Sequence, residues 1–217
     1  LFIDARNYYT VVDRTLNEWS EWQLKNLNAI VWLYRGEKSK YNDLLQEYLR
    51  YFRTMPEYLI GKSAKRVFSA IDGVEDFEDL KDALLSEIEE EKQDCKEKLS
   101  QAPKKERKSI QTCSDQYIAM LQSDLAVLNE ALWLIEKFGD GVYADIPGLC
   151  KVATLEEIEA KGYSLTPGAY VGVAPAEDDG VDFHERMTEI HKELLSLQEE
   201  SNRLMETISK NWEEMGL

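Results

Sequence analysis

The sequence has little of what enzymes use for nucleophilic or metal chemistry. Its 217 residues include two histidines and three cysteines, and the cysteines show no C-x-x-C spacing. It also lacks G-x-S-x-G, H-E-x-x-H and P-loop motifs and any adjacent Pro-Pro pair. His184 and His191 lie seven positions apart on one helical segment, so they miss the i, i+4 spacing of a helical zinc pair. No catalytic, cofactor-binding or metal-binding residue is therefore predicted in this chain.

Other absences in the sequence indicate the cellular compartment and the class of protein to which the chain belongs. Cys95, Cys113 and Cys150 are an odd number, which favours reduced thiols and a cytoplasmic location over a disulfide framework or a zinc site. No apolar run approaches the roughly 20 residues of a membrane span, so no membrane association is expected. The chain starts at Leu1 rather than Met and shows no signal peptide. We expect it to be a piece of a longer protein.

The charge balance is strongly acidic. Asp and Glu number 42 against 26 Lys and Arg, which gives a formal charge of −16 at pH 7. A surface that grips DNA needs clustered basic residues, so most of this surface is not expected to contact a phosphate backbone. Hydrophobic residues at 43% and charged residues at 31% predict a soluble globular fold with its own core.

Apolar residues recur at helical spacing through most of the chain, which predicts a mainly α fold. Ser20 and Gln23 have the form of a capping box, and a helix follows them. A second helical pattern covers residues 41–53. Gly61-Lys62-Ser63 has the letters that end a phosphate-binding loop, but Pro56 stands where that motif needs Gly. Nucleotide binding at this segment is therefore not predicted.

Two long helical patterns follow, over residues 77–99 and 110–135, and the short polar link between them predicts a long antiparallel helical hairpin. Residues 72–98 hold twelve acidic side chains and four lysines, a local charge of −8. Four basic side chains lie at the tip, within residues 104–108. Three interpretations stay open: a solvated acidic hairpin, a protein-binding prong, and a DNA contact by the small basic tip.

Residues 141–180 change character and form a turn-rich segment with short extended pieces. Thr154 has the form of an N-cap for a short helix that Gly162 ends. Residues 165–168 read as a turn, and residues 170–173 as a short strand. The end of the segment, with three consecutive acidic residues, reads as an exposed linker.

The C-terminal residues carry the clearest periodicity. Ten positions alternate in spacing between four and three residues, which is a heptad seam. One helix cannot bury such a seam in water, so it packs on the hairpin of the same chain or on a partner's helices. Ser201 and Asn211 lie in the seam, where polar residues lower stability but can fix register or partner. The predicted partner interface is its apolar part: Phe183, Met187, Ile190, Leu194, Leu197, Leu204, Ile208 and Met215.

The N-terminal run Leu1–Ala5 reads as a buried strand, and a lone strand is not stable. Other strands must lie upstream of it, or it packs in an unusual way. Five segments result: 1–14 (strand and connector), 15–70 (helices), 71–140 (long hairpin), 141–180 (turn-rich segment and acidic linker) and 181–217 (partner-binding helix).

Three blocks of the chain resemble the C-terminal part of the modification (M) subunit of type I restriction-modification systems. They are residues 1–6, residues 19–24 running on to 33–37, and residues 148–158 continuing through 162–172, about a third of the chain. In the third block the family motif falls on Thr154, Tyr163, Leu165, Pro167, Gly168, Tyr170 and Gly172.

This chain departs from the family at one motif position. The family's block ends L-T-P-G-R-Y-V-G, and Ala169 stands here at the Arg position. A polar or phosphate contact made by that Arg in relatives would be lost or relocated in this chain.

The resemblance implies a parent enzyme that transfers a methyl group from S-adenosylmethionine to adenine N6 in DNA. Its methyl-donor loop and N/D-P-P-Y/F motif would lie upstream of Leu1, so no cofactor is expected in this segment. The first strand would be a remnant of the parent's Rossmann-like sheet. The expected partners are the specificity subunit, which the C-terminal helix would contact, the restriction subunit as a second candidate, and DNA through the full complex.

Three functional hypotheses follow. The first is an assembly and partner-binding segment of such a methyltransferase subunit. The second is a self-contained acidic helical scaffold that homodimerises through its C-terminal helix. The third is an intact enzyme with an unfamiliar site.

Overall fold

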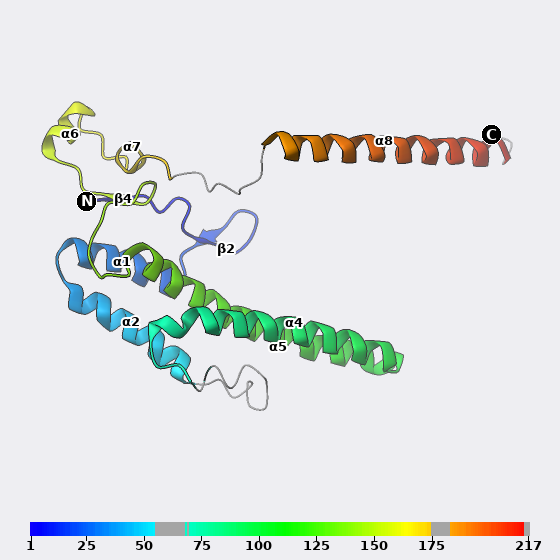
Figure 1. Ribbon diagram of the computed structural model, residues 1–217, viewed down its shortest axis with the longest axis horizontal. Helices are drawn as coiled ribbons and strands as arrows, with labels where there is room; N and C mark the ends of the chain where they lie inside the picture. Colours follow the sequence, from blue (N-terminus) through cyan, green and yellow to red (C-terminus); the bar gives the residue numbers. More distant parts are fainter. Residues whose placement is uncertain (55–67, 69, 175–182, 215–217) are drawn as a thin grey trace. The chain divides into compact units, whose positions relative to one another are not determined.

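The computed structural model describes residues 1–54, 68, 70–174 and 183–214. It divides into two units, Leu1–Ala174 and Pro175–Leu217, and each is described by itself (Figure 1). Most of the described residues are helical, which confirms the mainly α prediction. The Gly61-Lys62-Ser63 segment, the acidic linker from residue 175 onward and Met215 lie outside the described residues.

The first unit begins its helical core with α1 (Glu21–Tyr34) and α2 (Lys38–Arg53). The predicted capping box is confirmed: the Ser20 hydroxyl accepts from the Gln23 amide at 3.1 Å, and the Gln23 side chain accepts from the Ser20 amide at 3.0 Å. Gly36 ends the turn after α1 with a φ of 75°, which favours glycine. The two helices pack against each other through their apolar faces.

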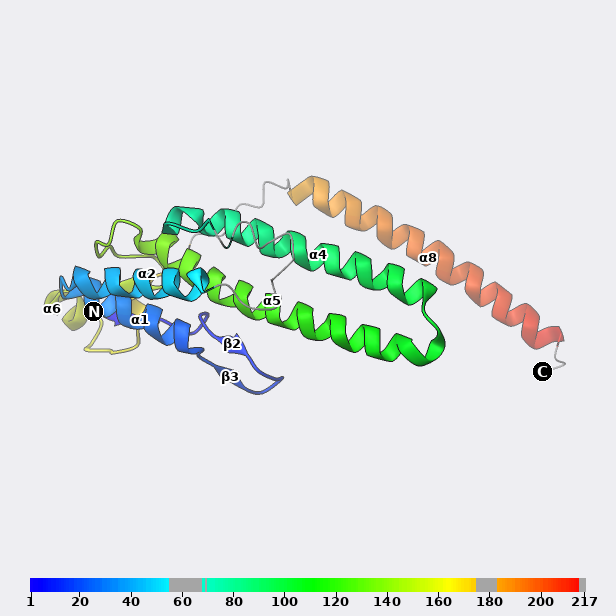
Figure 2. The same cartoon turned by 90° about the horizontal axis from the view of Figure 1, so that it is seen from below.

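A short 3₁₀ turn, η2 (Val74–Asp76), leads into α4 (Phe77–Gln101), and α5 (Lys104–Phe138) follows two residues later. The two long helices run side by side along most of their length (Figure 2). Helix α5 also packs on α1 and α2, so one core joins α1, α2, α4 and α5. Its largest fully buried side chains are Ile30, Tyr41, Tyr48, Phe52, Phe77, Leu80, Leu84, Glu87, Leu121, Leu128 and Leu134.

Among the described residues, α5 is the helix whose length and apolar composition would also suffice to cross a membrane. Its apolar positions Leu121, Leu128 and Leu134 are fully buried against neighbouring helices of the same unit. The interior of this unit therefore accounts for part of the apolar stretch of α5, since core helices share that composition.

Two small sheets flank the helices. Strand β1 (Phe2–Ile3) pairs antiparallel with β4 (Cys150–Lys151), and β2 (Thr10–Val11) pairs with β3 (Asn17–Glu18). The predicted N-terminal strand thus has a partner inside the chain, and its residues are half-buried rather than buried. Its origin in a Rossmann-like sheet stays a prediction.

The predicted short strand at residues 170–173 is wrong. Residues Gly168–Val171 form the helical turn α7, and the amides of Tyr170 and Val171 donate to the Pro167 carbonyl at 2.9 and 3.2 Å. Proline fixes its own φ, here −55°, in the helical range and so starts a turn of helix. This local geometry overrides the strand preference of Tyr and Val, and Gly172 ends the turn with a φ of 72°.

The second unit contains the single long helix α8 (Phe183–Glu214), which spans the described part of the predicted partner-binding segment. Its backbone is continuous helix from end to end.

A buried hydrogen-bond network joins the N-terminal segment to the core, and it predicts a large effect of Asn26→Ala. The Asn26 amide donates to the Tyr8 hydroxyl and the Glu130 carbonyl, both at 2.9 Å, and accepts from the Tyr48 hydroxyl at 2.9 Å. The substitution leaves buried partners unpaired and should lower the free energy of unfolding by about 2–4 kcal/mol in urea denaturation. The exposed Asn28 of the same helix is the matched control, and Asn28→Ala should change stability by less than about 0.5 kcal/mol. Similar losses for both variants would contradict this network's role.

Candidate partner-binding site

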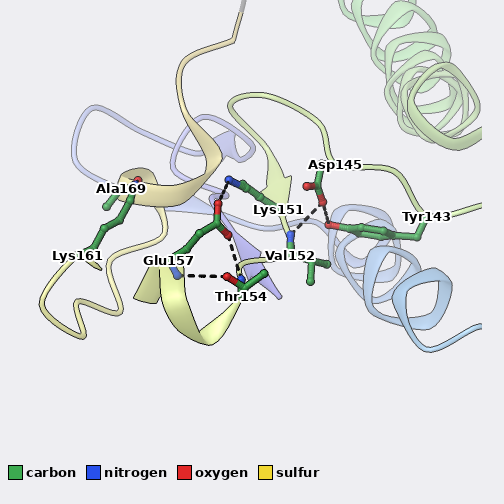
Figure 3. Close-up of polar contacts among 8 residues, drawn as sticks. All are labelled: Tyr143, Asp145, Lys151, Val152, Thr154, Glu157, Lys161 and Ala169. Carbon is green, nitrogen blue, oxygen red and sulfur yellow. Dashed lines mark hydrogen bonds and ion pairs between the residues drawn. The ribbon is translucent and has the colours of Figure 1, made fainter. Parts of the chain in front are cut away.

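The most specific motif block is built around a tight loop at residues 146–150. The backbones of Ile146 and Cys150 exchange hydrogen bonds at 2.9 and 3.0 Å, and Gly148 between them has a φ of 79°. The Asp145 carboxylate accepts from the Tyr143 hydroxyl and the Val152 amide, both at 2.9 Å (Figure 3). Burial raises the pKa of the Cys150 thiol, so it stays protonated at neutral pH. The backbone hydrogen bonds between Ile146 and Cys150 and the hydrogen bonds of the Asp145 carboxylate therefore hold both ends of the loop in place.

The N-terminal residues pack directly on this block. The Asp4 amide donates to the Leu149 carbonyl at 2.7 Å, and the Phe2 ring stacks on Tyr170 with centroids 3.9 Å apart. The Gly148 amide donates to the Val171 carbonyl at 2.9 Å, which joins the loop to α7. Two segments that are distant in the sequence, both singled out by the family resemblance, therefore form one structure.

Helix α6 (Leu155–Ala160) begins with the predicted capping box. The Thr154 hydroxyl accepts from the Glu157 amide at 3.2 Å, and Glu157 accepts from the Thr154 amide at 3.0 Å. Glu157 also forms an ion pair with Lys151 at 2.8 Å (Figure 3). The hydrogen bond from Lys151 and then that from Thr154 lower the pKa of Glu157 below its ordinary value of 4.5. One carboxylate thus ties α6 to β4.

Gly168 lies where the N-terminal segment comes closest to α7. A Cβ at this position would lie 2.4 Å from Nη2 of Arg6, whose guanidinium is bonded to Asp4 at 2.7 Å. That hydrogen bond lowers the pKa of the Asp4 carboxyl. A side chain at Gly168 would push the Arg6 guanidinium aside, which is a small shift for the end of a flexible and exposed side chain.

A cation lies close to Ala169, although the arginine of the family motif is absent at this position. The Lys161 ammonium donates to the Ala169 carbonyl, and it lies 4.8 Å from the centroid of the Tyr170 ring (Figure 3). A lysine from the end of α6 therefore stands next to the position at which the related block has arginine.

Three apolar side chains in or just after α6 are strongly exposed. The exposed fraction of the residue is 83% for Leu155, 68% for Tyr163 and 75% for Leu165. We call these three residues the α6 patch. Tyr163 has a φ of 58°, a rare conformation for a residue other than glycine. Sequence reasoning selected Tyr163 and Leu165 and missed Leu155. The position of Leu155 directly after the N-cap, where the helix faces solvent, was the signal in the sequence that could have identified it.

The apolar seam of α8 is exposed within its own unit. The six described seam side chains keep 41–59% of their surface, because the unit contains no second helix among its described residues. Phe183 belongs to the helix, but its side chain is outside the described set, as is Met215. The six are Met187, Ile190, Leu194, Leu197, Leu204 and Ile208.

Three further apolar side chains of α8 are exposed and were not in the predicted interface: Leu195, Met205 and Trp212, at 52%, 62% and 59%. Leu195 lies at heptad position b, away from the seam. Met205 and Trp212 lie at heptad position e, beside the seam, so they widen the apolar face in the second half of the helix.

Within the described ranges, no group of three or more His, Cys, Asp or Glu side chains is placed to hold a metal ion. The α6 patch and the α8 seam both present apolar side chains that are bordered by polar ones. Such surfaces bind other proteins.

The chain is similar to subunits of restriction enzymes. Over 69 residues it is 44% identical to the type I restriction enzyme MjaIX methylase subunit of Methanocaldococcus jannaschii. Over 69 residues it is 46% identical to the type I restriction enzyme HindI methylase subunit of Haemophilus influenzae. No protein-family model matches the chain, and no solved structure does.

The matched stretch is 32% of this chain, and it covers 12% and 16% of the two relatives. The resemblance to methylase subunits of type I restriction enzymes is therefore confirmed over about a third of the chain, which supports a fragment of such a subunit.

The role of Glu157 gives a pH-dependent prediction. Its folded pKa lies below 4.5, so its ion pair and cap stabilise α6 fully above that pH and are lost as the pH falls through the folded value. Glu157→Gln should reduce the protection of the α6 amides at pH 7 and remove their pH dependence between about pH 5 and 3. Amide hydrogen exchange measures both effects. Glu156→Gln, at the exposed neighbour in the same turn, is the control, and an equal effect of both changes would contradict the assignment.

Proposed function

We propose that this chain is the assembly segment of a type I restriction-modification M subunit. It docks on the specificity subunit through α8 and helps to position the parent enzyme on DNA for adenine-N6 methylation. The similarity to methylase subunits supports the family. The observation that carries the docking proposal is the exposed heptad seam of α8, since a row of apolar side chains in water gains free energy when a partner covers it.

The charges beside the seam favour a different chain over a second copy. Glu193 and Glu200 occupy one flank of the seam. In a parallel pair of two α8 helices they would face Gln198 and Met205 of the other copy, and in the antiparallel register that brings these two positions together they would face each other. Neither arrangement forms an ion pair at these positions. A partner helix with basic residues beside its own seam would form such pairs, so the charges support a heteromeric bundle.

The width of the apolar face supports a bundle rather than a two-stranded coil. From Leu204 onward, Met205 and Trp212 make the face wider than an a/d seam. One partner helix covers a narrow seam, whereas a wider face needs contact with two helices. We propose that the specificity subunit supplies them.

Catalysis belongs to the parent enzyme in this proposal. S-adenosylmethionine and the methyl transfer are assigned to residues upstream of Leu1, and no residue of this chain is given a catalytic role. DNA is reached through the full complex, with the restriction subunit as a further candidate partner. The complex would work in the cytoplasm, with the three cysteines reduced.

A self-contained scaffold that homodimerises through α8 is the second candidate, and the same exposed seam motivates it. Light scattering of the chain with and without the specificity subunit separates the two proposals. A mass of two chains that the specificity subunit leaves unchanged would favour the scaffold. A monomer that forms a stoichiometric complex would favour the assembly segment.

Substitutions on α8 test the docking directly. Leu194→Glu and Leu197→Glu place carboxylates in the seam, where burying an unpaired charge costs several kcal/mol, so affinity for the specificity subunit should fall at least about 100-fold. Leu195→Glu makes the same chemical change at heptad position b, away from the seam, and should leave affinity within about threefold. Pull-down and calorimetric titration measure both, and circular dichroism checks the helix.

Deletion of everything after Gly180 should abolish retention of the specificity subunit in the same pull-down. Equal retention by the full and the shortened chain would show that the docking surface lies elsewhere.

A further inference from the structure

The hairpin of α4 and α5 is polarised in charge along its length. Residues 72–93 carry ten acidic and two basic side chains, a net charge of −8. Residues 94–116, which surround the connection between the helices, carry six basic and four acidic side chains, a net charge of +2. In a chain of net charge −16, the far end of the hairpin is thus locally positive.

The lysines of the two ends differ in their pairing. In residues 72–93, Lys81 and Lys92 each lie within 4.0 Å of a carboxylate one helical turn earlier. At the tip, Lys104, Lys105 and Lys108 are exposed, and none forms an ion pair within the part of the chain that the structure describes. The tip therefore presents cations whose charge no protein carboxylate neutralises.

These cations continue into a shallow groove on one face of α5, which we call the tip groove. It is lined by Lys105, Lys108, Ser109, Thr112, Cys113 and Gln116. Apart from the cysteine, these positions are spaced i, i+3, i+4, i+7 and i+11, so they share a face about 16 Å long. Their ammonium, hydroxyl and amide groups can all donate hydrogen bonds, and neither Glu106 nor Asp115 lines the groove.

We propose that the tip groove contacts the phosphate backbone of double-stranded DNA held by the enzyme complex. This inference rests on the proposed function, which brings DNA to the complex. A row of ammonium and hydroxyl donors suits successive phosphates, and such contacts position a protein without reading sequence. The acidic part of the hairpin, residues 72–93, repels the same polyanion, so DNA meets the hairpin at its end and does not lie along it.

Charge substitutions in the complex with the specificity subunit test the contact. Lys104→Gln, Lys105→Gln and Lys108→Gln combined should weaken duplex binding about tenfold at low salt. The slope of log affinity against log salt should become less negative by up to about 2.7, because three phosphate contacts are removed. The matched control combines Lys81→Gln and Lys92→Gln on α4 with Lys137→Gln near the other end of α5, which removes the same charge away from the tip and should change affinity less than twofold. Equal weakening by both sets would overturn the proposal.

A cross-link identifies what lies at the tip groove. Cys113 is exposed and lines the groove, whereas Cys95 and Cys150 are buried, so a thiol-reactive photo-cross-linker attaches selectively to Cys113. With duplex DNA in the complex, the cross-link should form to a DNA strand. Cross-links to a protein subunit alone, or none, would overturn the proposal, and the first result would identify the hairpin as a protein-binding prong.

The two proposals fail in different ways. The triple tip variant should retain the specificity subunit in pull-down, whereas Leu194→Glu should lose it. If the unaltered chain does not bind that subunit, the proposed function is wrong. The tip groove is then tested with the full chain and duplex DNA at low salt, with the same two sets of lysine variants.

Discussion

An apolar seam that its own helix cannot cover is the constraint on which the rest depends. In α8 the seam positions recur every three or four residues, and each described one keeps about half of its surface exposed within its unit. Water makes this arrangement unfavourable, and burial against partner helices relieves it. We propose that another chain completes this segment, and the similarity to methylase subunits of restriction enzymes is consistent with this proposal.

The motif block supplies a different kind of surface. Its backbone is held by several short-range devices: the Asp145 carboxylate, the Thr154 cap and the Lys151–Glu157 ion pair. These contacts tie β4 to the start of α6. The Tyr163 amide donates to the Ile158 carbonyl at 2.9 Å, which joins the following loop to α6, and the Tyr163 and Leu165 side chains remain exposed. A rigid frame with exposed apolar groups loses little conformational entropy when a partner covers it.

Local signals in the sequence predicted local structure well. The Ser20 and Thr154 capping boxes and the helices that follow them are confirmed, because each depends on residues three or four positions apart. The pairing of β1 with β4 and the stacking of Phe2 on Tyr170 depend on residues about 150 positions apart, and nothing in the local pattern marks them. The error at residues 170–173 arose because Pro167 set the backbone more strongly than the strand preference of the residues after it.

The central claim is that the specificity subunit covers the seam of α8, and amide hydrogen exchange along the helix measures this most directly. Alone, the helix should exchange rapidly over residues 187–208, because the described residues of its unit include no second helix to protect its amides. Addition of the specificity subunit should slow exchange in this region by at least about tenfold, with little change in α1 and α2. Exchange in α8 that stays the same in the presence of a saturating specificity subunit would contradict the claim.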